Sequence, residues 1–142
     1  MDVPEMAGHL IRRLNQHSTQ VFANRMQALG MDLTPVQFAA MSVIAAAPGI
    51  DQARIAAEIA YDRATIGGVI DRLEQKGYIA RTVAKHDRRA REVRLTETGA
   101  TVLAETQPEV SALQNDILAG LSAAERAMFM ELARKVIDQA EG

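Results

Sequence analysis

The residues whose side chains could bind a ligand or do chemistry cluster in one cationic segment in the middle of the chain. Residues 61–94 hold nine Lys or Arg and five Asp or Glu, a net charge of +4, whereas the whole protein of 142 residues has a formal charge of −2. The densest part reads Lys85-His86-Asp87-Arg88-Arg89-Ala90-Arg91. Clustered cations bind polyanions because each neutralised phosphate releases condensed counterions, so the segment predicts contact with nucleic acid. A solvated surface hairpin is the alternative interpretation.

The sequence argues against several other kinds of site. It has no cysteine, which excludes disulfides, thiolate zinc sites and cysteine nucleophiles. His9, His17 and His86 form no pattern with a nucleophile or a carboxylate pair, so we predict no catalytic residue and no enzyme. His9 and His17 also lack the four-residue spacing that places two ligands on one helix face. We therefore predict neither a metal site nor a cofactor.

The chain before the cationic segment is predicted to form three helices. The first runs from about Pro4 to Leu29 and stops at Gly30, where a left-handed cap residue fits. Thr34 and Gln37 form a capping box that opens the second helix. Asp51 caps a short third helix.

The cationic segment itself has the pattern of a helix followed by a hairpin. Asp62 is expected to cap a fourth helix over residues 62–76, and Tyr78 to Val83 and Arg91 to Leu95 alternate like strands. Two short helices followed by a basic hairpin make a winged helix. Its recognition helix enters the major groove, and its wing, here residues 84–91, reaches the minor groove. Charge and topology therefore predict DNA binding independently.

The C-terminal third is acidic, with three basic and eight acidic residues after Leu95. Thr96 is expected to cap a long helix that ends at Gly120, and Ser122 to Glu125 form a second capping box. The last helix places Met128, Leu132 and Val136 on one face. The first and last helices have wide apolar stripes that must be buried. We expect both chain ends to pack on each other and against a second copy.

The predicted fold is therefore mainly α: a winged helix-turn-helix with a two- to three-stranded β-wing and with dimerisation helices at both ends. We expect one domain over residues 1–142. Residues 31–96 would form the winged helix-turn-helix, and residues 1–30 and 97–142 the dimerisation helices.

The run from Thr34 to Gly99 resembles the MarR family of bacterial transcriptional regulators. The resemblance rests on these stretches: Thr34-Pro35-Val36-Gln37-Phe38, Gln52-Ala53-Arg54-Ile55-Ala56, Asp62-Arg63-Ala64-Thr65-Ile66, Asp71-Arg72-Leu73-Glu74-Gln75-Lys76-Gly77-Tyr78-Ile79-Ala80-Arg81, Asp87-Arg88-Arg89-Ala90 and Leu95-Thr96-Glu97-Thr98-Gly99. The resemblance implies a homodimer that binds a pseudo-palindromic operator in double-stranded DNA, usually as a repressor. It also implies that a small aromatic carboxylate or phenolic ligand weakens that binding.

The resemblance assigns DNA contacts to the fourth helix and the wing. Asp87 and Arg89 match the family's Asp-x-Arg pair, in which the carboxylate orients a guanidinium for the minor groove; the alternative is that Asp87 is a turn residue. Arg88 and Arg91 would contact phosphates. The full set is Arg63, Ala64, Thr65, Gly67, Gly68, Arg72, Lys85, Asp87, Arg88, Arg89 and Arg91.

Two departures from the family pattern concern these contacts. Ala84 and Lys85 stand where family wings often carry Asp-Pro, which predicts a looser and more basic loop. Gly67 and Gly68 lie in mid-helix, where each costs about 1 kcal/mol relative to alanine. Bare backbone could let the helix sit deep in the groove, or the glycines could allow close packing on the third helix; both interpretations stay open.

A ligand pocket in this architecture would be lined by the first, second and fifth helices. Arg12 or Arg13 could hold a carboxylate or a phosphate in a bidentate contact, or could form ion pairs with acids of the C-terminal helices or face solvent. The candidate lining is His9, Arg12, Arg13, Gln16, Phe22, Phe38 and Met41. The candidate effectors are small aromatic carboxylates, phenols and thioesters.

Two further expectations concern location and an alternative role. The N-terminus shows no secretory signal, and the most apolar window, residues 38–50, is too short to span a bilayer. We expect a soluble cytoplasmic protein without a membrane partner. The alternative function is a winged-helix protein-interaction module without ligand response, although Asp87, Arg88 and Arg89 argue against it.

Overall fold

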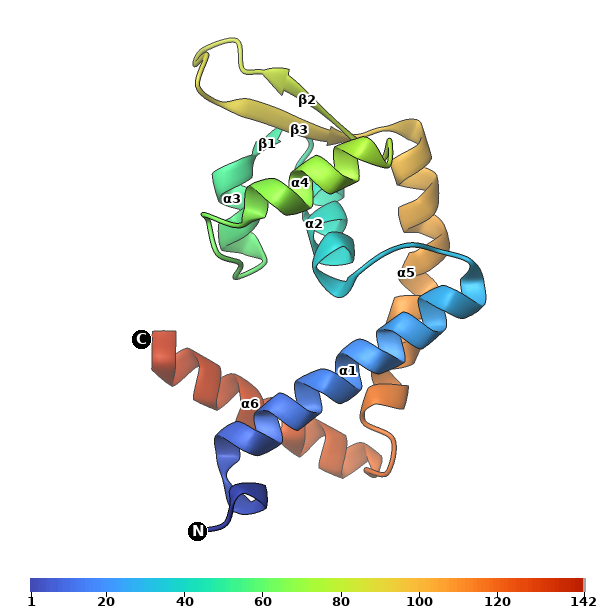
Figure 1. Cartoon of the computed structure of the whole chain (residues 1–142), viewed down its shortest axis with the longest axis vertical. Coiled ribbons are helices and arrows are strands. Elements are labelled where there is room, and N and C mark those ends of the chain that lie inside the picture. The colour runs from blue at the N-terminus through green and yellow to red at the C-terminus, as the bar shows by residue number, and fades with distance from the viewer. Residues whose placement is uncertain (142) are drawn as a thin grey trace.

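The computed structural model describes residues 1–141; Gly142, the last residue of the predicted domain, lies outside them. A winged-helix unit forms one end of the molecule, and long helices from both ends of the chain form the other (Figure 1). In chain order the elements are η1 (Val3–Glu5), α1 (Ala7–Leu29), α2 (Pro35–Ala46), β1 (Ile50–Asp51), α3 (Gln52–Glu58), α4 (Ile66–Gln75), β2 (Ile79–Val83), β3 (Arg91–Leu95), α5 (Glu97–Ile117) and α6 (Ala123–Glu141).

Most helix boundaries follow the local capping chemistry. The Thr34 hydroxyl accepts a hydrogen bond from the Gln37 N–H at 3.2 Å, and the Gln37 side chain accepts one from the Thr34 N–H, so the predicted capping box of α2 is confirmed. Ser122 and Glu125 exchange the same pair of bonds at the start of α6. Asp51 caps α3 through the Arg54 N–H, and Gly30 closes α1 with a φ of 68°.

Three of the predicted helices have wrong boundaries. The first helix begins at Ala7, because Val3–Glu5 form a separate 3₁₀ turn. The fourth begins at Ile66 and ends at Gln75 rather than covering residues 62–76. The Asp62 carboxylate accepts from the Ala64 N–H at 2.8 Å and therefore stabilises a turn instead of capping the helix. The fifth helix ends at Ile117, and Gly120 lies in the turn that follows.

A three-stranded antiparallel sheet carries the hairpin. Its order is β1-β3-β2, so the short strand β1 adds a third strand to the predicted pair. In register, Ile50 faces Val93 and Val93 also faces Arg81, which makes β3 the central strand. The hairpin therefore rises from the winged-helix core, and the loop between β2 and β3 forms its free tip (Figure 1).

The core lies between the helices of the winged-helix unit, its sheet and α5. Gly99, in the first turn of α5, must be glycine, because a Cβ there would lie 1.9 Å from the Tyr78 carbonyl oxygen. This close approach places the start of α5 against the end of α4. The largest fully buried side chains are Met41, Ile44, Ile55, Ile66, Ile70, Leu73, Val93, Thr106 and Leu113.

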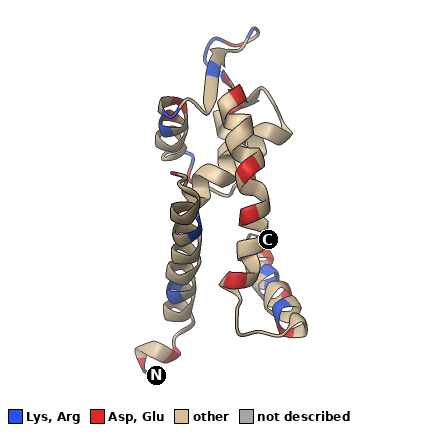
Figure 2. Cartoon of the chain, turned by 90° about the vertical axis from the view of Figure 1, so that its right-hand side faces the viewer, with Lys and Arg blue, Asp and Glu red and all other residues tan. Residues whose placement is uncertain are grey.

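The two ends of the chain do not pack on each other as expected. The C-terminal half of α1 packs on α5, where Phe22 and Met26 are buried, whereas no residue between Ala123 and Glu141 is buried. The helices α1 and α6 overlap in Figure 1, but the rotated view of Figure 2 separates them. Apolar side chains on both therefore stay exposed: Leu10, Ile11, Leu14, Met128, Met130, Leu132, Val136 and Ile137.

Candidate nucleic-acid interface

The exposed side of α4 and the turn before it form the first half of the candidate interface. Ile66, Ile70 and Leu73 point into the core, so the opposite side of the helix faces outward. Because α4 starts late, Arg63, Ala64 and Thr65 lie in the preceding turn, where all three are exposed. Gly68 and Arg72 are exposed on the helix itself, and Gly67 is half-buried.

The wing forms the second half. Lys85, Arg88, Arg89 and Arg91 are exposed, and Figure 2 shows basic residues at the hairpin tip while acidic residues are spaced along α5. Within residues 1–141 the Asp87 carboxylate has no ion pair with a guanidinium; it accepts the backbone N–H of Arg89 at 2.9 Å. The turn interpretation of Asp87 therefore describes this structure, since a carboxylate that bonds two residues on makes an Asx turn. The Arg89 guanidinium has no ion pair among residues 1–141.

A cleft of about 410 Å³ joins the two halves. It brings Arg63 from the turn before α4 together with Arg89 and Arg91 from the wing, although these residues are distant in sequence. Asp87 of the wing also lines the cleft. The remaining predicted contacts lie outside the lining: Ala64, Thr65, Gly67, Gly68, Arg72, Lys85 and Arg88. The start of α3 forms the third wall, which the sequence analysis missed; its only signal was the Asp51 cap. The cleft is lined by Asp51, Gln52, Ala53, Arg63, Ile66, Asp87, Arg89, Ala90 and Arg91.

Arg81 fixes the wing relative to α4. Its Nη2 donates to Asp71 Oδ1 at 2.7 Å and to Glu74 Oε1 at 2.9 Å, so one arginine of β2 binds two carboxylates of α4. The hydrogen bond between Arg81 and Glu74 lowers the pKa of Glu74 below its ordinary value, and the same bond is the main reason that the pKa of Arg81 is raised. The contact also offsets part of the negative charge of two acids beside the candidate DNA surface.

Packing does not require the two mid-helix glycines. A Cβ on Gly68 would have no heavy atom of residues 1–141 within 4 Å, and one on Gly67 would meet only the Gln52 side-chain nitrogen at 3.4 Å. Close packing on the third helix therefore does not explain Gly68. At Gly67 the neighbour is the end of a flexible side chain, so that contact is an ordinary one.

The predicted ligand residues fall into two separate places. Phe22 and Phe38 line a pocket of about 230 Å³ between α1, α2 and α5, the three helices expected from the sequence. Their ring centroids lie 6.4 Å apart in an edge-to-face arrangement. Met41 is fully buried in the core, so its assignment to the pocket was wrong. The complete lining is Ser18, Phe22, Pro35, Phe38, Val110, Leu113, Gln114 and Ile117.

The polar half of the predicted set lies on a different surface. A groove of about 540 Å³ follows α1 and is lined by His9, Arg12, Arg13, Gln16, His17 and Gln20. The expectation that these residues share a pocket with the phenylalanines is therefore wrong within one chain. Arg12 Nη2 lies 3.1 Å from His9 Nδ1, and neither Arg12 nor Arg13 has an ion pair in the described part of the chain.

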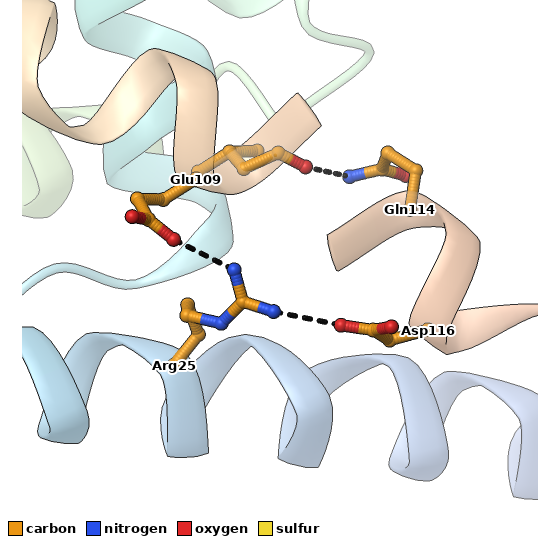
Figure 3. Close-up of polar contacts among 5 residues, drawn as sticks. Arg25, Glu109, Gln114 and Asp116 are labelled. Carbon is orange, nitrogen blue, oxygen red and sulfur yellow. Dashed lines mark hydrogen bonds and ion pairs between the residues drawn. The ribbon is translucent and has the colours of Figure 1, made fainter. Parts of the chain in front are cut away.

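The arginine that does bind the acids of α5 is Arg25. Its two terminal nitrogens donate to Glu109 and Asp116, each at 2.7 Å, and thus span two turns of α5 (Figure 3). One turn of α1 earlier, Phe22 lines the pocket, and Gln114 lies between the two carboxylates in sequence and also lines it. The Arg25 clamp, meaning Arg25 with Glu109 and Asp116, therefore holds α1 against α5 beside the pocket.

Residues 1–141 contain no cluster of three or more His, Cys, Asp or Glu that could hold a metal ion. Within the same residues, no helix is long and apolar enough to cross a membrane.

Comparison with known proteins assigns the chain to a family. A model of the MarR family matches residues 31–90. The HTH-type transcriptional repressor NicR of Pseudomonas putida is 34% identical over 140 residues, which cover 99% of this chain and 87% of that protein. The transcriptional regulator HosA of Escherichia coli is 33% identical over 97% of this chain and 99% of its own length.

Solved structures agree with these relatives. The regulator PcaV from Streptomyces coelicolor, in complex with its natural ligand, has a TM-score of 0.88 and 30% identity over 99% of this chain and 97% of its own. BpsR from Bordetella bronchiseptica, whose DNA binding is regulated by 6-hydroxynicotinic acid, has a TM-score of 0.88 and 29% identity over 97% of both chains. A mutant of MarR from Escherichia coli, complexed with operator DNA, has a TM-score of 0.81 and 28% identity over 91% of both chains. With its winged helix and basic hairpin, this chain belongs to the MarR family of DNA-binding transcriptional regulators.

Proposed function

We propose that the protein is a dimeric, sequence-specific repressor that places α4 in the major groove and the wing at the minor groove. The cleft that joins Arg63 to Arg89 and Arg91 carries this proposal, because it presents cations from both elements to one duplex. Arg63, Thr65 and Arg72 would read base edges. Lys85, Arg88 and Arg91 would contact phosphates, and Arg89 would enter the narrow groove.

The exposed apolar faces of α1 and α6 support a homodimer. Leu10 and Ile11 on α1 and Leu132 and Val136 on α6 are each more than half exposed in the single chain. A second copy is the occupant that fits both faces at once, because MarR-family regulators bind pseudo-palindromic operators as homodimers. On this proposal, residues 1–30 and 97–142 form the dimerisation part of a single domain, and residues 31–96 form the DNA-binding part.

A small aromatic carboxylate, phenol or thioester is the proposed effector. The pocket between α1, α2 and α5 offers aromatic and aliphatic walls with two polar groups, Ser18 and Gln114. Arg12 and Arg13 lie on the groove beside it along α1 and could supply a carboxylate contact once a second copy covers that groove. BpsR favours this class, because 6-hydroxynicotinic acid, which regulates its DNA binding, is an aromatic carboxylate. We place the protein in the cytoplasm, with the DNA that it regulates.

Fluorescence anisotropy with a duplex selected from a random pool tests the DNA part of the proposal. The logarithm of affinity should fall steeply and linearly with the logarithm of salt concentration. Arg89→Ala should weaken binding by roughly tenfold and reduce the preference for narrow minor grooves, because one groove contact is worth about 1–3 kcal/mol.

Arg134→Ala is the matched control, since it removes the same charge from α6, away from the wing. It should leave operator affinity unchanged. If operator affinity shows no steep salt dependence, the electrostatic account of DNA binding by the wing is wrong. If Arg89→Ala binds the operator as tightly as the control, the wing takes no part in DNA recognition.

A further inference from the structure

Lys76, at the C-terminal end of α4, forms hydrogen bonds and an ion pair with residues distant in sequence. Its ammonium donates to the Gln37 side-chain oxygen at 2.9 Å and to the backbone oxygen of Asp32, and it lies 3.4 Å from an Asp32 carboxylate oxygen. The Lys76 side chain is only 14% exposed. A lysine withdrawn from water to this extent needs such partners, because an unpaired buried charge is costly. The recognition helix is therefore anchored to residues about 40 positions earlier in the chain.

The partners of Lys76 lie next in sequence to the wall of the pocket, although neither lines it. Gln37 is buried in the first turn of α2 and closes its capping box, and the neighbouring Pro35 and Phe38 line the pocket. Asp32 lies in the connection between α1 and α2. The Lys76 side chain, at the C-cap of α4, thus holds both the start of α2 and the segment that leads into it.

A second set of hydrogen bonds connects the start of α5 to the same end of α4. The Thr96 hydroxyl donates to the Gly77 carbonyl, and the Thr96 N–H donates to the Tyr78 carbonyl at 3.0 Å. Gly99 presses against that same carbonyl, so the start of α5 cannot separate from it without breaking these contacts. Further along, α5 lines the pocket with Val110, Leu113, Gln114 and Ile117.

We propose that residues 76–78 are the junction through which the pocket and the recognition helix control each other, and that Lys76 is the positioning residue of this junction. Two of the three pocket walls, α2 and α5, both attach to the chain just after α4 at this point. A molecule that moves the first turn of α2 must then move Lys76 or break its bonds, and the shift reaches α4. Coupling between sites is reciprocal, so DNA that holds α4 must also restrain the first turn of α2. The proposal rests on the DNA-binding function proposed above.

Hydrogen exchange of the full-length protein, with and without the selected duplex, tests the reciprocal effect without any effector. The Gln37 N–H is bonded to the Thr34 hydroxyl and the Phe38 N–H to the Thr34 carbonyl, so both report fraying of the first turn of α2. Operator binding should slow their exchange by at least about threefold. The capped first turn of α6, between Ser122 and Arg126, serves as the internal control and should change little.

Lys76→Met removes the ammonium but keeps most of the apolar stem. It should abolish the operator-induced slowing at Gln37 and Phe38 and weaken operator binding by about three- to thirtyfold. The salt slope should stay unchanged, because a positioning residue releases no counterion. Lys135→Met, the matched control on an exposed lysine of α6, should retain both the slowing and the affinity.

Each remaining outcome overturns the inference. If operator binding leaves the exchange of the Gln37 and Phe38 N–H groups unchanged in the wild type, the inference is refuted without any variant. It is also refuted if operator binding still slows their exchange in Lys76→Met. A salt slope reduced by about one in Lys76→Met would make Lys76 a phosphate contact instead. A wild-type protein that binds no duplex with salt-dependent affinity would refute the proposed function, and the junction with it.

Discussion

Gly68 shows how a single residue can separate stability from recognition. It is exposed on α4, has helical rather than left-handed backbone, and would place a Cβ in open space. A glycine in this situation destabilises its helix by about 0.5–1 kcal/mol relative to alanine. Since packing does not demand it, the interpretation left is the one in which bare backbone lets α4 approach the floor of the major groove.

Gly68→Ala should therefore raise the free energy of unfolding by about 0.5–1 kcal/mol and at the same time weaken operator binding by roughly tenfold. Urea unfolding and anisotropy measure the two effects on the same preparation. Gly8→Ala is the matched control: Gly8 also lies in a helix, in α1, with no neighbour within 4 Å among the described residues. It should gain stability without losing affinity. If Gly68→Ala behaves like Gly8→Ala, the glycine has no role in recognition.

At the scale of elements, the contact between β2 and α4 makes a pH-dependent contribution to stability. Hydrogen bonding to Arg81 lowers the pKa of Glu74 from 4.5, so the stabilising contact is complete above that value and is lost as the pH falls through the lower pKa of the folded state. Glu74→Gln should therefore be less stable than the wild type near neutral pH, and the difference should shrink below pH 4.5. Urea midpoints measured across this range give the comparison.

Arg81→Met provides the second half of a double-mutant cycle for the same pair. Once the guanidinium is gone, Glu74→Gln should have little further effect on the urea midpoint at any pH. Should the substitution cost as much stability in the Arg81→Met protein as in the wild type, the pKa shift of Glu74 would have another cause, and Arg81 would not be the link between wing and helix.

Local chemistry explains which elements could be predicted from the sequence. The capping boxes at Thr34 and Ser122 are satisfied within four residues of chain, so no distant contact was needed to find them. Asp62 misled the prediction because its carboxylate bonds the Ala64 N–H and forms a turn, a choice that the same residues allow equally well.

Long-range contacts explain what could not be predicted. Met41 has the same apolar character as the pocket residues, and only the packing of the whole core distinguishes it from Phe38. Nothing in the sequence near Arg25 or Lys76 indicates partners on distant elements. The candidate DNA-binding residues were easier to nominate from the sequence, because a high density of positive charge indicates an interface regardless of how the chain folds.

For the whole molecule, the densest cluster of basic residues and the exposed apolar surface lie at opposite ends. The basic tip of the hairpin lies at one end, and the exposed apolar faces of α1 and α6 lie at the other (Figures 1 and 2). The acidic residues along α5 stand between them. This division favours DNA on the side of the wing and keeps phosphates away from the helices that would form the dimer. It also means that the two faces can be tested without touching the DNA surface.

Leu132→Glu should convert the dimer to a monomer, because Leu132 is 54% exposed in the single chain and would lie within the proposed interface. Burying such a side chain contributes about 1.5–3 kcal/mol, and a carboxylate in its place would have to be desolvated without a partner. Sedimentation should show half the wild-type mass, and operator affinity should fall because each half-site would bind alone. Ala127→Glu adds the same charge to the side of α6 opposite the apolar face and should stay dimeric. A Leu132→Glu protein with the mass and affinity of the wild type would mean that α6 does not hold the two copies together, and the apolar face of α1 would then have to form the interface without it.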